Sequence, residues 1–594
     1  MTRPRTAQEF IHWLEAGDGA RWMRLGAVLA LTLALSLLVA WKQFHGPVTE
    51  TTLVQADMGR QLARGEGFTT LVNYPQTAAF LQARGIKFEP TKPFPELHHA
   101  PLYSLLIGGG LWALPAAQRD KLFAESPVPP DGFAADYLLL AVNLGLLWLA
   151  TWLTYDLGRR IFEPRAGWLA SLALLLSVPI WQQTVALNGI PLMMVLVLLA
   201  FSVWHRAETT EGRVPYLALG LLGINCGLLF LSEYSAGALV LVALVYAGWR
   251  FSAGARWFAV AAVAAGFLLV SGPWLVRNIA LTGSPVGLAL QNVALKAGDS
   301  TAEPSVVRAA LTPTLPPIDL NKLGNKTLTS LQENLKSRIW SGGAMWLAAF
   351  CIAGTLYAFR SEAANRLRWL FVASLGVLLL SQAVFNSGES DRWVAVWLAP
   401  LIMIFGAGFF FVLLGSNASL AQWPRAITTV VLVAQALPLL HDAMEPRRLH
   451  FQYPPYLPGL FQGMRRELAQ RGVTERYGLM ADVPAGVAWY GQARVWAQPP
   501  RLRDFYEITL IQPIGELLLT PRTLDRPFFS ELNAKPLNPG SLGAFSNRFG
   551  EWGEIYAGLL TGRLPGEFPL QQPTKLMENL YVLVNATMPP PRGK

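Results

Sequence analysis

The stretch GPVTETTLVQADMGRQLARGEGFTT (residues 46–70) opens a polar segment that closes with PFPELHHAPLYSLL (93–106). This segment, from His45 to Tyr103, separates the first hydrophobic run from the next one. Connections longer than about 12–15 residues are usually functional or disordered, and the leucines and aromatic residues here argue against disorder. It carries several acids and a histidine pair: Glu50, Asp57, Glu66, Glu96, His98 and His99. We therefore expect it to form the floor of an active site.

The composition indicates a membrane protein. Of 594 residues, 52% are hydrophobic and only 14% are charged, whereas soluble domains average about a quarter charged residues. The net charge of +10 is explained by arginines at membrane boundaries rather than by nucleic-acid binding. The two cysteines, Cys226 and Cys351, lie in apolar runs and imply no disulfide framework.

Eleven apolar runs are candidate membrane spans. They lie near residues 25–41, 137–155, 166–187, 190–204, 215–231, 236–249, 257–276, 340–359, 369–385, 393–414 and 426–440. Several are at or below the ~17–25 residues that a spanning helix needs. Arginines cluster after alternate runs, which is the positive-inside pattern and places the N-terminus in the cytoplasm. Residues 1–24 are interpreted as a cytoplasmic segment on the membrane surface, not as a cleavable signal peptide.

The run PLYSLLIGGGLWALP (101–115) is expected to lie along the outer membrane surface. It is short for a span, and crossing would move the later arginine clusters outside. Residues 42–136 and 277–339 are then external loops of a membrane domain that covers 25–441. An odd number of spans also places 442–594 outside, where short alternating elements predict a small α/β domain. The predicted fold class is therefore mainly α and polytopic, with external juxtamembrane helices.

Four motifs resemble membrane glycosyltransferases of the GT-C fold, particularly the bacterial relatives of protein O-mannosyltransferases and the lipid A aminoarabinose transferase (glycosyltransferase family 39-like). The motifs are RGEGF (64–68) after an acidic residue, HHAPLY (98–103), GPWLVRNIALTGSPVG (272–287) and SDRWVAVWLAPL (390–401). The resemblance covers about the first 440 residues. It implies transfer of a sugar from a polyprenyl-phosphate carrier to a protein, lipid or polysaccharide acceptor, at the external face of the inner (cytoplasmic) membrane.

Such a reaction needs a carboxylate to deprotonate or orient an acceptor hydroxyl. Glu50 and Asp57 are seven residues apart, so on a helix they would project from nearly one face. Counting back from Gly65, the family's catalytic aspartate falls nearest Glu50, whereas Asp57 has the expected residue type. We favour Asp57, because Glu50 lies close to where the first span leaves the membrane. The alternative is that either acid is a solvated residue on an interfacial helix.

Cationic side chains are also needed, to hold the lipid phosphate. Arg277 and Arg392 stand at predicted external ends of spans and are the candidates, with snorkelling anchors at the headgroup level as the alternative. Two further residues at outer turns, Asn188 and Glu233, are expected to line the cavity. In the relatives an acidic residue often stands near the position of Asn188 and a basic one near that of Glu233, so both depart from the family pattern.

The histidine pair suggests a divalent metal. His98 and His99, with Glu96, could bind one beside the carboxylates. Adjacent residues of an extended segment point opposite ways, so we expect at most one of these histidines to reach a shared site. Ordinary loop histidines are the alternative.

Two other functional classes remain open. A transporter would need ionisable residues deep in its spans, which here are nearly free of charge. A non-catalytic membrane scaffold or glycan-binding protein is consistent with the imperfect acid motif. No G-x-x-x-x-G-K-[ST] loop is present, which disfavours an ATP-driven pump or an enzyme using cytosolic nucleotide sugars. The glycosyltransferase interpretation leads.

Overall fold

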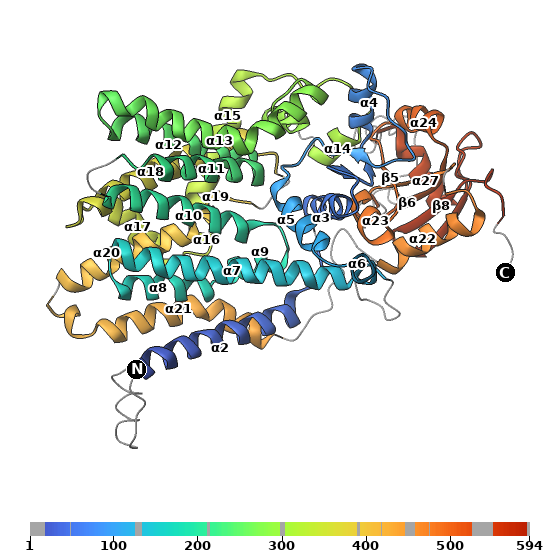
Figure 1. Cartoon of the computed structure of the whole chain (residues 1–594). Helices are drawn as coiled ribbons and strands as arrows, with labels where there is room; N and C mark the ends of the chain where they lie inside the picture. Colours follow the sequence, from blue (N-terminus) through green and yellow to red (C-terminus); the bar gives the residue numbers. More distant parts are fainter. Residues whose placement is uncertain are drawn as a thin grey trace.

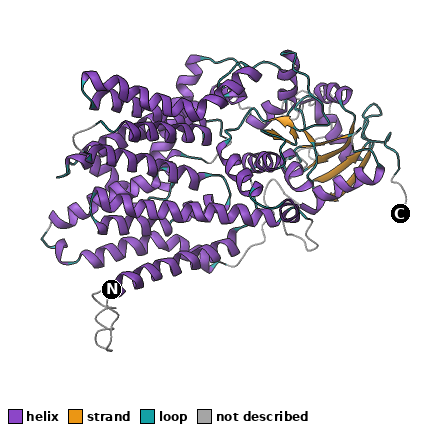
Figure 2. Cartoon of the chain, viewed as in Figure 1, coloured by secondary structure: helices purple, strands orange, loops and turns teal. Residues whose placement is uncertain are grey.

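The computed structural model describes residues 18–47, 49–124, 133–210, 214–297, 303–388, 392–416, 418–445, 458–474, 476–524 and 550–590. Most of the predicted N-terminal surface segment therefore lies outside the described residues. Apolar helices run side by side in a bundle, and the strands gather at one end of it (Figures 1 and 2). Helix α2 (Asp18–Gln43) begins at the opposite end of the bundle (Figure 1).

Seven helices of the described residues are long and apolar enough to cross a membrane. They are α2, α7 (Ala134–Ile161), α10 (Ile190–Thr209), α13 (Ala253–Thr282), α18 (Glu362–Phe385), α20 (Ala399–Ser416) and α21 (Pro424–Met444). Helices α8 (Pro164–Leu175) and α9 (Val178–Val185) meet at a bend of 55° and can form an eighth span together.

The remaining apolar helices of the bundle are shorter. They are α11 (Tyr216–Ser232), η1 (Tyr234–Ala238) with α12 (Leu239–Arg250), and α17 (Trp346–Thr355) after η3 (Asn334–Arg338) and α16 (Ile339–Ser341). Each of the eleven predicted spans falls on a helix or helix pair of the bundle, with α19 (Val394–Trp397) leading into α20. Because α11, α12 and α17 are at or below the usual spanning length of ~17–25 residues, the count of eleven stays a prediction.

The first predicted external loop folds between the bundle and the strands, whereas part of the second lies along the bundle (Figure 1). The first contains α3 (Glu50–Ala63), β1 (Thr69–Thr70), β2 (Val72–Asn73), α4 (Pro75–Ala83), β3 (Phe94–Pro95), α5 (Leu102–Trp112) and α6 (Ala116–Leu122). The second contains η2 (Gly287–Val293), α14 (Pro304–Ala309) and α15 (Leu320–Glu333). The segment 45–103 is thus ordered structure, which fits its apolar and aromatic content.

Helix α5 packs directly on α3. A Cβ added to Gly59 would lie 2.6 Å from the Cγ2 atom of Ile107, and one added to Gly108 would lie 3.0 Å from the Gly59 carbonyl oxygen. These glycines therefore allow the two helix backbones to approach closely. With 11 residues, α5 is roughly 16 Å long, about half the hydrocarbon thickness of a bilayer. This length agrees with the prediction that residues 101–115 do not span the membrane.

The C-terminal region is an α/β domain built on a six-stranded sheet in the order β2-β5-β4-β6-β8-β7. Its strands are β4 (Gly478–Ala481), β5 (Val495–Ala497), β6 (Ile514–Leu519), β7 (Gln572–Met577) and β8 (Leu580–Val584), and its helices are α22 (Pro458–Arg471), α23 (Pro484–Gly491), α24 (Leu502–Ile511) and α27 (Gly553–Thr561). The first four strands of that order are parallel to one another, and β8 runs antiparallel to both of its neighbours, β6 and β7. The edge strand β2 comes from the first predicted external loop, so the sheet is not confined to residues 442–594.

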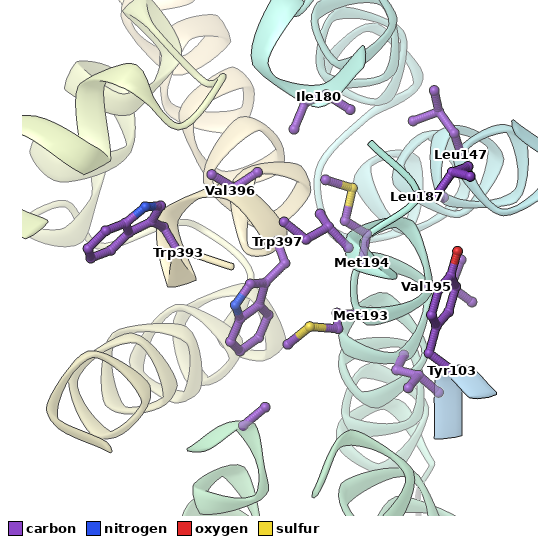
Figure 3. Close-up of a cluster of buried hydrophobic side chains, with 14 of the residues drawn as sticks. Tyr103, Leu147, Ile180, Leu187, Met193, Met194, Val195, Trp393, Val396 and Trp397 are labelled. Carbon is purple, nitrogen blue, oxygen red and sulfur yellow. The ribbon is translucent and has the colours of Figure 1, made fainter. Parts of the chain in front are cut away.

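A continuous apolar core holds the bundle together. Trp181, Trp204 and Trp397 are fully buried in it, and Cys226 and Cys351 are buried as free thiols. Figure 3 shows Trp397 beside Met193, with Tyr103 on the opposite side of the cluster. The Tyr103 hydroxyl donates to Asn143 Oδ1 at 3.1 Å, which ties α5 to α7. The first predicted external loop is therefore anchored to the bundle at HHAPLY.

Candidate active site

Polar side chains from seven separate segments, which include η2 and the segment before α19 as well as those named next, line a cavity of about 70 Å³ that we call the histidine cavity. It lies between the start of α3, the segment after β3, η1, α14 and the end of α18. Its polar lining residues are Thr51, Gln55, His98, His99, Glu233, Tyr234, Ser235, Asn292, Arg308, Gln382, Asn386, Ser387 and Arg392. Four predicted substrate-binding residues, His98, His99, Glu233 and Arg392, are thus brought together.

Arg392 is buried at one wall of this cavity, with 5% of its side chain exposed. Its Nη2 donates to Gln55 Oε1 at 2.6 Å, and its Nη1 pairs with Glu233 Oε2 at 3.4 Å. Glu233 is part-exposed at the end of α11, where the helix turns into η1. Because two fixed partners hold it, the guanidinium is positioned toward the cavity and not free to snorkel.

Both histidines reach the cavity, contrary to the expectation that only one would. The chain bends at this point instead of running extended, because Glu96 Oε1 accepts the backbone N–H groups of His98 at 2.7 Å and His99 at 3.0 Å. The same oxygen lies 3.0 Å from His99 Nδ1. Glu96 is therefore a positioning residue, and it does not line the cavity itself.

The histidine pair presents hydrogen-bonding atoms that no described residue satisfies. His98 Nδ1 and His99 Nε2 are buried without a partner among the described residues. Burial, reinforced by the Arg308 guanidinium, lowers the pKa of His98 well below its ordinary value, so this ring is neutral at pH 7. Burial alone would raise the pKa of Glu96, but His99 and His98 outweigh it and hold that pKa at about 2.

Arg308, on α14, is a cavity residue that the sequence did not single out. It is 2% exposed, and its guanidinium lies 5.9 Å from the centre of the Tyr74 ring. Its surroundings, PSVVRAAL, match no motif, and only its place in a predicted external loop could have drawn attention to it. Gln55 was also missed, although its position four residues after Thr51 puts both on one helix face.

Glu50 stands in the first turn of α3, where the side chain of Thr49 caps the helix. Its carboxylate pairs with Arg522 of the C-terminal domain at 3.0 Å and accepts a hydrogen bond from the Tyr74 hydroxyl at 3.3 Å. Burial raises the pKa of Glu50, but the charges of Arg522 and Arg308 outweigh that effect and hold it below its ordinary value. Glu50 is therefore ionised at neutral pH.

A second cavity, of about 540 Å³, lies on the other side of Glu50, and we call it the interface cavity. The C-terminal domain forms most of its lining, with Glu50 and one side of α14 completing it. The two cavities share a thin wall. Glu50 lines the interface cavity and Thr51 the histidine cavity, while Ala309 faces the former and Arg308 the latter.

Asp57 lies outside both cavities, fully buried. Its Oδ1 pairs with Arg60 at 2.6 Å, and its Oδ2 accepts from Thr70 Oγ1 at 2.9 Å and from the Leu71 N–H at 2.7 Å. Arg60 in turn donates to the carbonyl groups of Ala488 and Trp489 in α23. Oδ1 of Asp57 thus holds the arginine that binds the C-terminal domain, and Oδ2 fixes the β1–β2 segment to α3. The sequence-based preference for Asp57 over Glu50 as the base has no support in this geometry.

Arg277 also stabilises the fold and lines neither cavity. Its guanidinium donates to the carbonyl groups of Glu96 and Phe68 at 3.1 Å and lies 4.5 Å from the centre of the Trp274 ring. It joins α13 to the residue before β1 and the residue after β3, the two strands that pair antiparallel. The Arg277 guanidinium is therefore bound within the protein and faces neither cavity, and it does not extend away from the protein as a snorkelling anchor would.

Asn188 caps a turn at the start of α10 and lines neither cavity. Its Oδ1 accepts the N–H of Ile190 at 3.2 Å, and its Nδ2 donates to Gln183. The side chain thereby stabilises the left-handed Gly189, whose missing Cβ leaves room for the Tyr103 ring. Its predicted place in the cavity lining is not observed.

The described residues form no cluster of ligands for the predicted divalent metal. Among the described residues, no group of three or more His, Cys, Asp or Glu side chains is placed to hold a metal ion. Glu96 uses Oε1 for the two histidine N–H groups, so the three residues do not converge on one point. A metal requirement stays a prediction.

Comparisons with known proteins identify the fold. Neither a protein-family model nor a curated protein matches the sequence. The alignment with the oligosaccharyltransferase of Archaeoglobus fulgidus, crystallised with Zn and sulfate, covers 82% of this chain and 67% of that protein, at 12% identity and a TM-score of 0.50. Its apo form covers 82% and 69% at 11% identity, also with a TM-score of 0.50. The ArnT protein of Cupriavidus metallidurans bound to undecaprenyl phosphate covers 95% and 99% at 13% identity, with a TM-score of 0.49.

The likeness to the archaeal enzyme shows that the chain has the GT-C fold, as its four motifs indicated. At such low identity it establishes the architecture alone, and the chemistry has to be argued from the residues of this chain.

Proposed function

We propose that this chain is a membrane glycosyltransferase that moves a sugar from a polyprenyl-phosphate carrier to an acceptor at the external face of the membrane. The observation that carries the proposal is the histidine cavity. Two buried arginines, Arg308 and Arg392, and two histidines with unsatisfied ring nitrogens meet there, beside a membrane bundle of the GT-C fold. Oriented guanidinium groups are the side chains best suited to bind a phosphate group.

The charge of the histidine cavity fits an anionic ligand. Among the described residues that line it, Glu233 is the one carboxylate, and its charge is met by Arg392 at 3.4 Å. Arg308 is a second buried arginine that lines the same cavity, beside His98. A phosphate bound here would place its oxygens near both guanidinium groups and accept hydrogen bonds from a protonated ring nitrogen of either histidine.

Glu50 is our candidate for the general base in place of Asp57. In the transfer, the acceptor hydroxyl oxygen forms a bond to the anomeric carbon while the bond from that carbon to the phosphate oxygen breaks. The phosphate leaves with the electron pair, and the hydroxyl proton passes to the Glu50 carboxylate. The arginines stabilise the negative charge that develops on the phosphate, and Glu50, at the wall between the cavities, is placed to act from the acceptor side.

The alternative functions fit less well. A transporter would carry ionisable groups within its spans, whereas the charged cluster described here lies in the external layer. A non-catalytic scaffold would not require buried arginines with directed partners, because each buried charge costs desolvation free energy. By the same proposal, the N-terminus is cytoplasmic and the C-terminal domain lies outside the inner membrane.

The test is a transfer assay with the purified full-length protein and a panel of polyprenyl-phosphate sugars. Release of polyprenyl phosphate that depends on an added acceptor is the expected result. Binding of polyprenyl phosphate is measured in parallel, with Arg503→Ala as a control because Arg503 is exposed on the C-terminal domain. A folded protein that neither binds the carrier nor turns over any donor would favour the scaffold function.

A further inference from the structure

We propose that the interface cavity binds a neutral, hydroxyl-rich ligand, a carbohydrate, and presents one of its hydroxyl groups to Glu50. This inference rests on the proposed function, because it assigns the acceptor side of that reaction. It starts from the contrast between the two cavities that share the Glu50 wall. One is small and cationic, whereas the other is several times larger and has a different chemistry.

The size of the interface cavity suits a sugar. Its volume of about 540 Å³ falls within the ~300–1,000 Å³ of typical small-molecule sites. Trp552 and Tyr556 form one side, with ring planes only 17° apart, and Trp552 is held by its Nε1 hydrogen bond to the Pro499 carbonyl at 2.9 Å. Rigid aromatic and proline surfaces of this kind contact the C–H groups of a ligand without losing conformational entropy.

The charge of the cavity disfavours an anion. Its charged lining residues are Glu50, Asp482 and Arg522, and Arg522 is already paired with Glu50 at 3.0 Å. Formal charges at neutral pH therefore leave an excess of one negative charge. A phosphorylated ligand would meet two carboxylates here, whereas the histidine cavity offers it two arginines. These charges argue against a phosphorylated ligand in the interface cavity and are compatible with a neutral one.

The polar groups are those that recognise hydroxyls. Asp482 Oδ2 accepts from the N–H of Thr520 at 2.8 Å and from its hydroxyl at 2.9 Å, while Oδ1 is buried without a partner among the described residues. Gln498 Nε2 donates to the Tyr556 hydroxyl at 2.9 Å, which fixes the orientation of both side chains. Ionised carboxylates only accept hydrogen bonds, so their natural partners are the O–H donors of a sugar.

The position of Glu50 between the two cavities assigns the interface cavity to the acceptor side of the reaction. A ligand in the interface cavity meets Glu50 directly, while the neighbouring residue Thr51 lines the histidine cavity proposed for the phosphate. Arg522 holds the Glu50 carboxylate in position and comes from the same domain that supplies Asp482 and Gln498. The C-terminal domain therefore contributes both ligand recognition and the orientation of the base.

The experiment is photo-crosslinking of the full-length protein with methyl glycosides (gluco, manno and galacto) that carry a neutral diazirine group, followed by peptide mass spectrometry. We expect labels on residues 481–484, 497–500 and 522–524. The unmodified glycoside should compete, and the 6-phosphate of the same sugar should not. Asp482→Asn and Gln498→Leu should each lower labelling roughly tenfold, as the loss of a hydrogen bond to a charged or fixed partner predicts. The control Glu507→Gln, at an exposed acid of the same domain, should leave labelling unchanged.

Several results would overturn the inference. Labelling confined to other segments, stronger competition by the sugar phosphate, or competition by a short hydrophilic peptide instead of a glycoside would each do so. Polyprenyl phosphate binding is measured on the same samples. If that binding and sugar transfer persist without neutral-glycoside labelling, this inference fails alone, whereas loss of carrier binding in the unaltered protein counts against the proposed function.

Discussion

The carboxylate of Glu50 and the guanidinium of Arg522 pair at 3.0 Å across 472 positions of sequence. The first residue opens the helix that follows the first span, and the second follows the last parallel strand of the C-terminal sheet. Their contact joins the acid proposed as the base to the domain proposed to recognise the acceptor. Docking of the C-terminal domain and the charge state of Glu50 are therefore coupled.

Glu50→Gln should abolish most of the transfer activity. The amide cannot accept the acceptor proton, and loss of a positioned general base typically costs about 10²–10⁴-fold in rate. Carrier binding should persist, because Glu50 does not line the histidine cavity. The measurement is kcat for sugar transfer beside the binding of polyprenyl phosphate. A variant with near-normal kcat would remove Glu50 from the mechanism.

Asp57→Asn should act on stability instead of chemistry. It removes the charge that faces the buried Arg60 at 2.6 Å, and breaking a buried pair costs roughly 3–5 kcal/mol. We expect a marked fall in Tm and, at temperatures where the variant stays folded, a kcat that is reduced less than in Glu50→Gln. A fully stable Asp57→Asn protein with a rate loss above a hundredfold would restore the sequence-based preference for Asp57.

The pH dependence of the rate should report on the Glu50–Arg522 pair. Glu50 acts as a base only when ionised, and its pKa lies below the ordinary 4.5, so the rate should fall only as pH drops below that value. Arg522→Gln removes the contact that lowers the pKa of Glu50, while burial still raises that pKa. The acid limb of kcat/KM should therefore move to higher pH. Arg503→Gln, at an exposed arginine of the same domain, is the control. Identical acid limbs in all three proteins would exclude Glu50 as the titrating base.

The sequence predicted the architecture better than the site. Long apolar runs with arginines at alternate ends determine where helices lie, so each predicted span falls on a helix or helix pair. HHAPLY and Arg392 were found because both belong to motifs. The pairing of β2 with β5 was not predicted, since two residues of a strand give no periodic signal.

The site residues that the structure places outside both cavities share one feature. Asp57 and Arg277 have the residue types that catalysis and phosphate binding require, but Asp57 is held by Arg60, Thr70 and Leu71, and Arg277 is held by the backbone carbonyl groups of Phe68 and Glu96. Arg308 and Arg522 carry no local pattern, and their roles arise only from the packing of α14 and the C-terminal domain against α3. Residue type and spacing identify candidates, whereas burial and hydrogen-bond partners decide among them.

Membrane topology can be tested with single cysteines. Arg119 lies in α6 and Arg160 in the last turn of α7, a helix of 28 residues, which is roughly 42 Å at 1.5 Å per residue. Arg119→Cys and Arg160→Cys should therefore react with a membrane-impermeant maleimide from opposite sides. The native Cys226 and Cys351 are buried and provide a low background. Labelling of both positions from one side would contradict the proposed orientation.

The last prediction concerns the donor phosphate and Arg392. Arg392→Ala should remove a charge-assisted contact worth roughly 1.5–3 kcal/mol, equivalent to about ten- to hundredfold weaker binding of polyprenyl phosphate. Arg392→Lys should restore binding only in part, because an ammonium group lacks the planar fork that holds Gln55 and a phosphate together. Since Ala also leaves Gln55 and Glu233 without their partner, Tm is measured for each variant, and binding is compared only among folded proteins. Arg503→Ala serves as the matched control. If a folded Arg392→Ala protein binds the carrier as tightly as the unaltered chain, Arg392 is a structural arginine, and Arg308 becomes the remaining candidate for the phosphate.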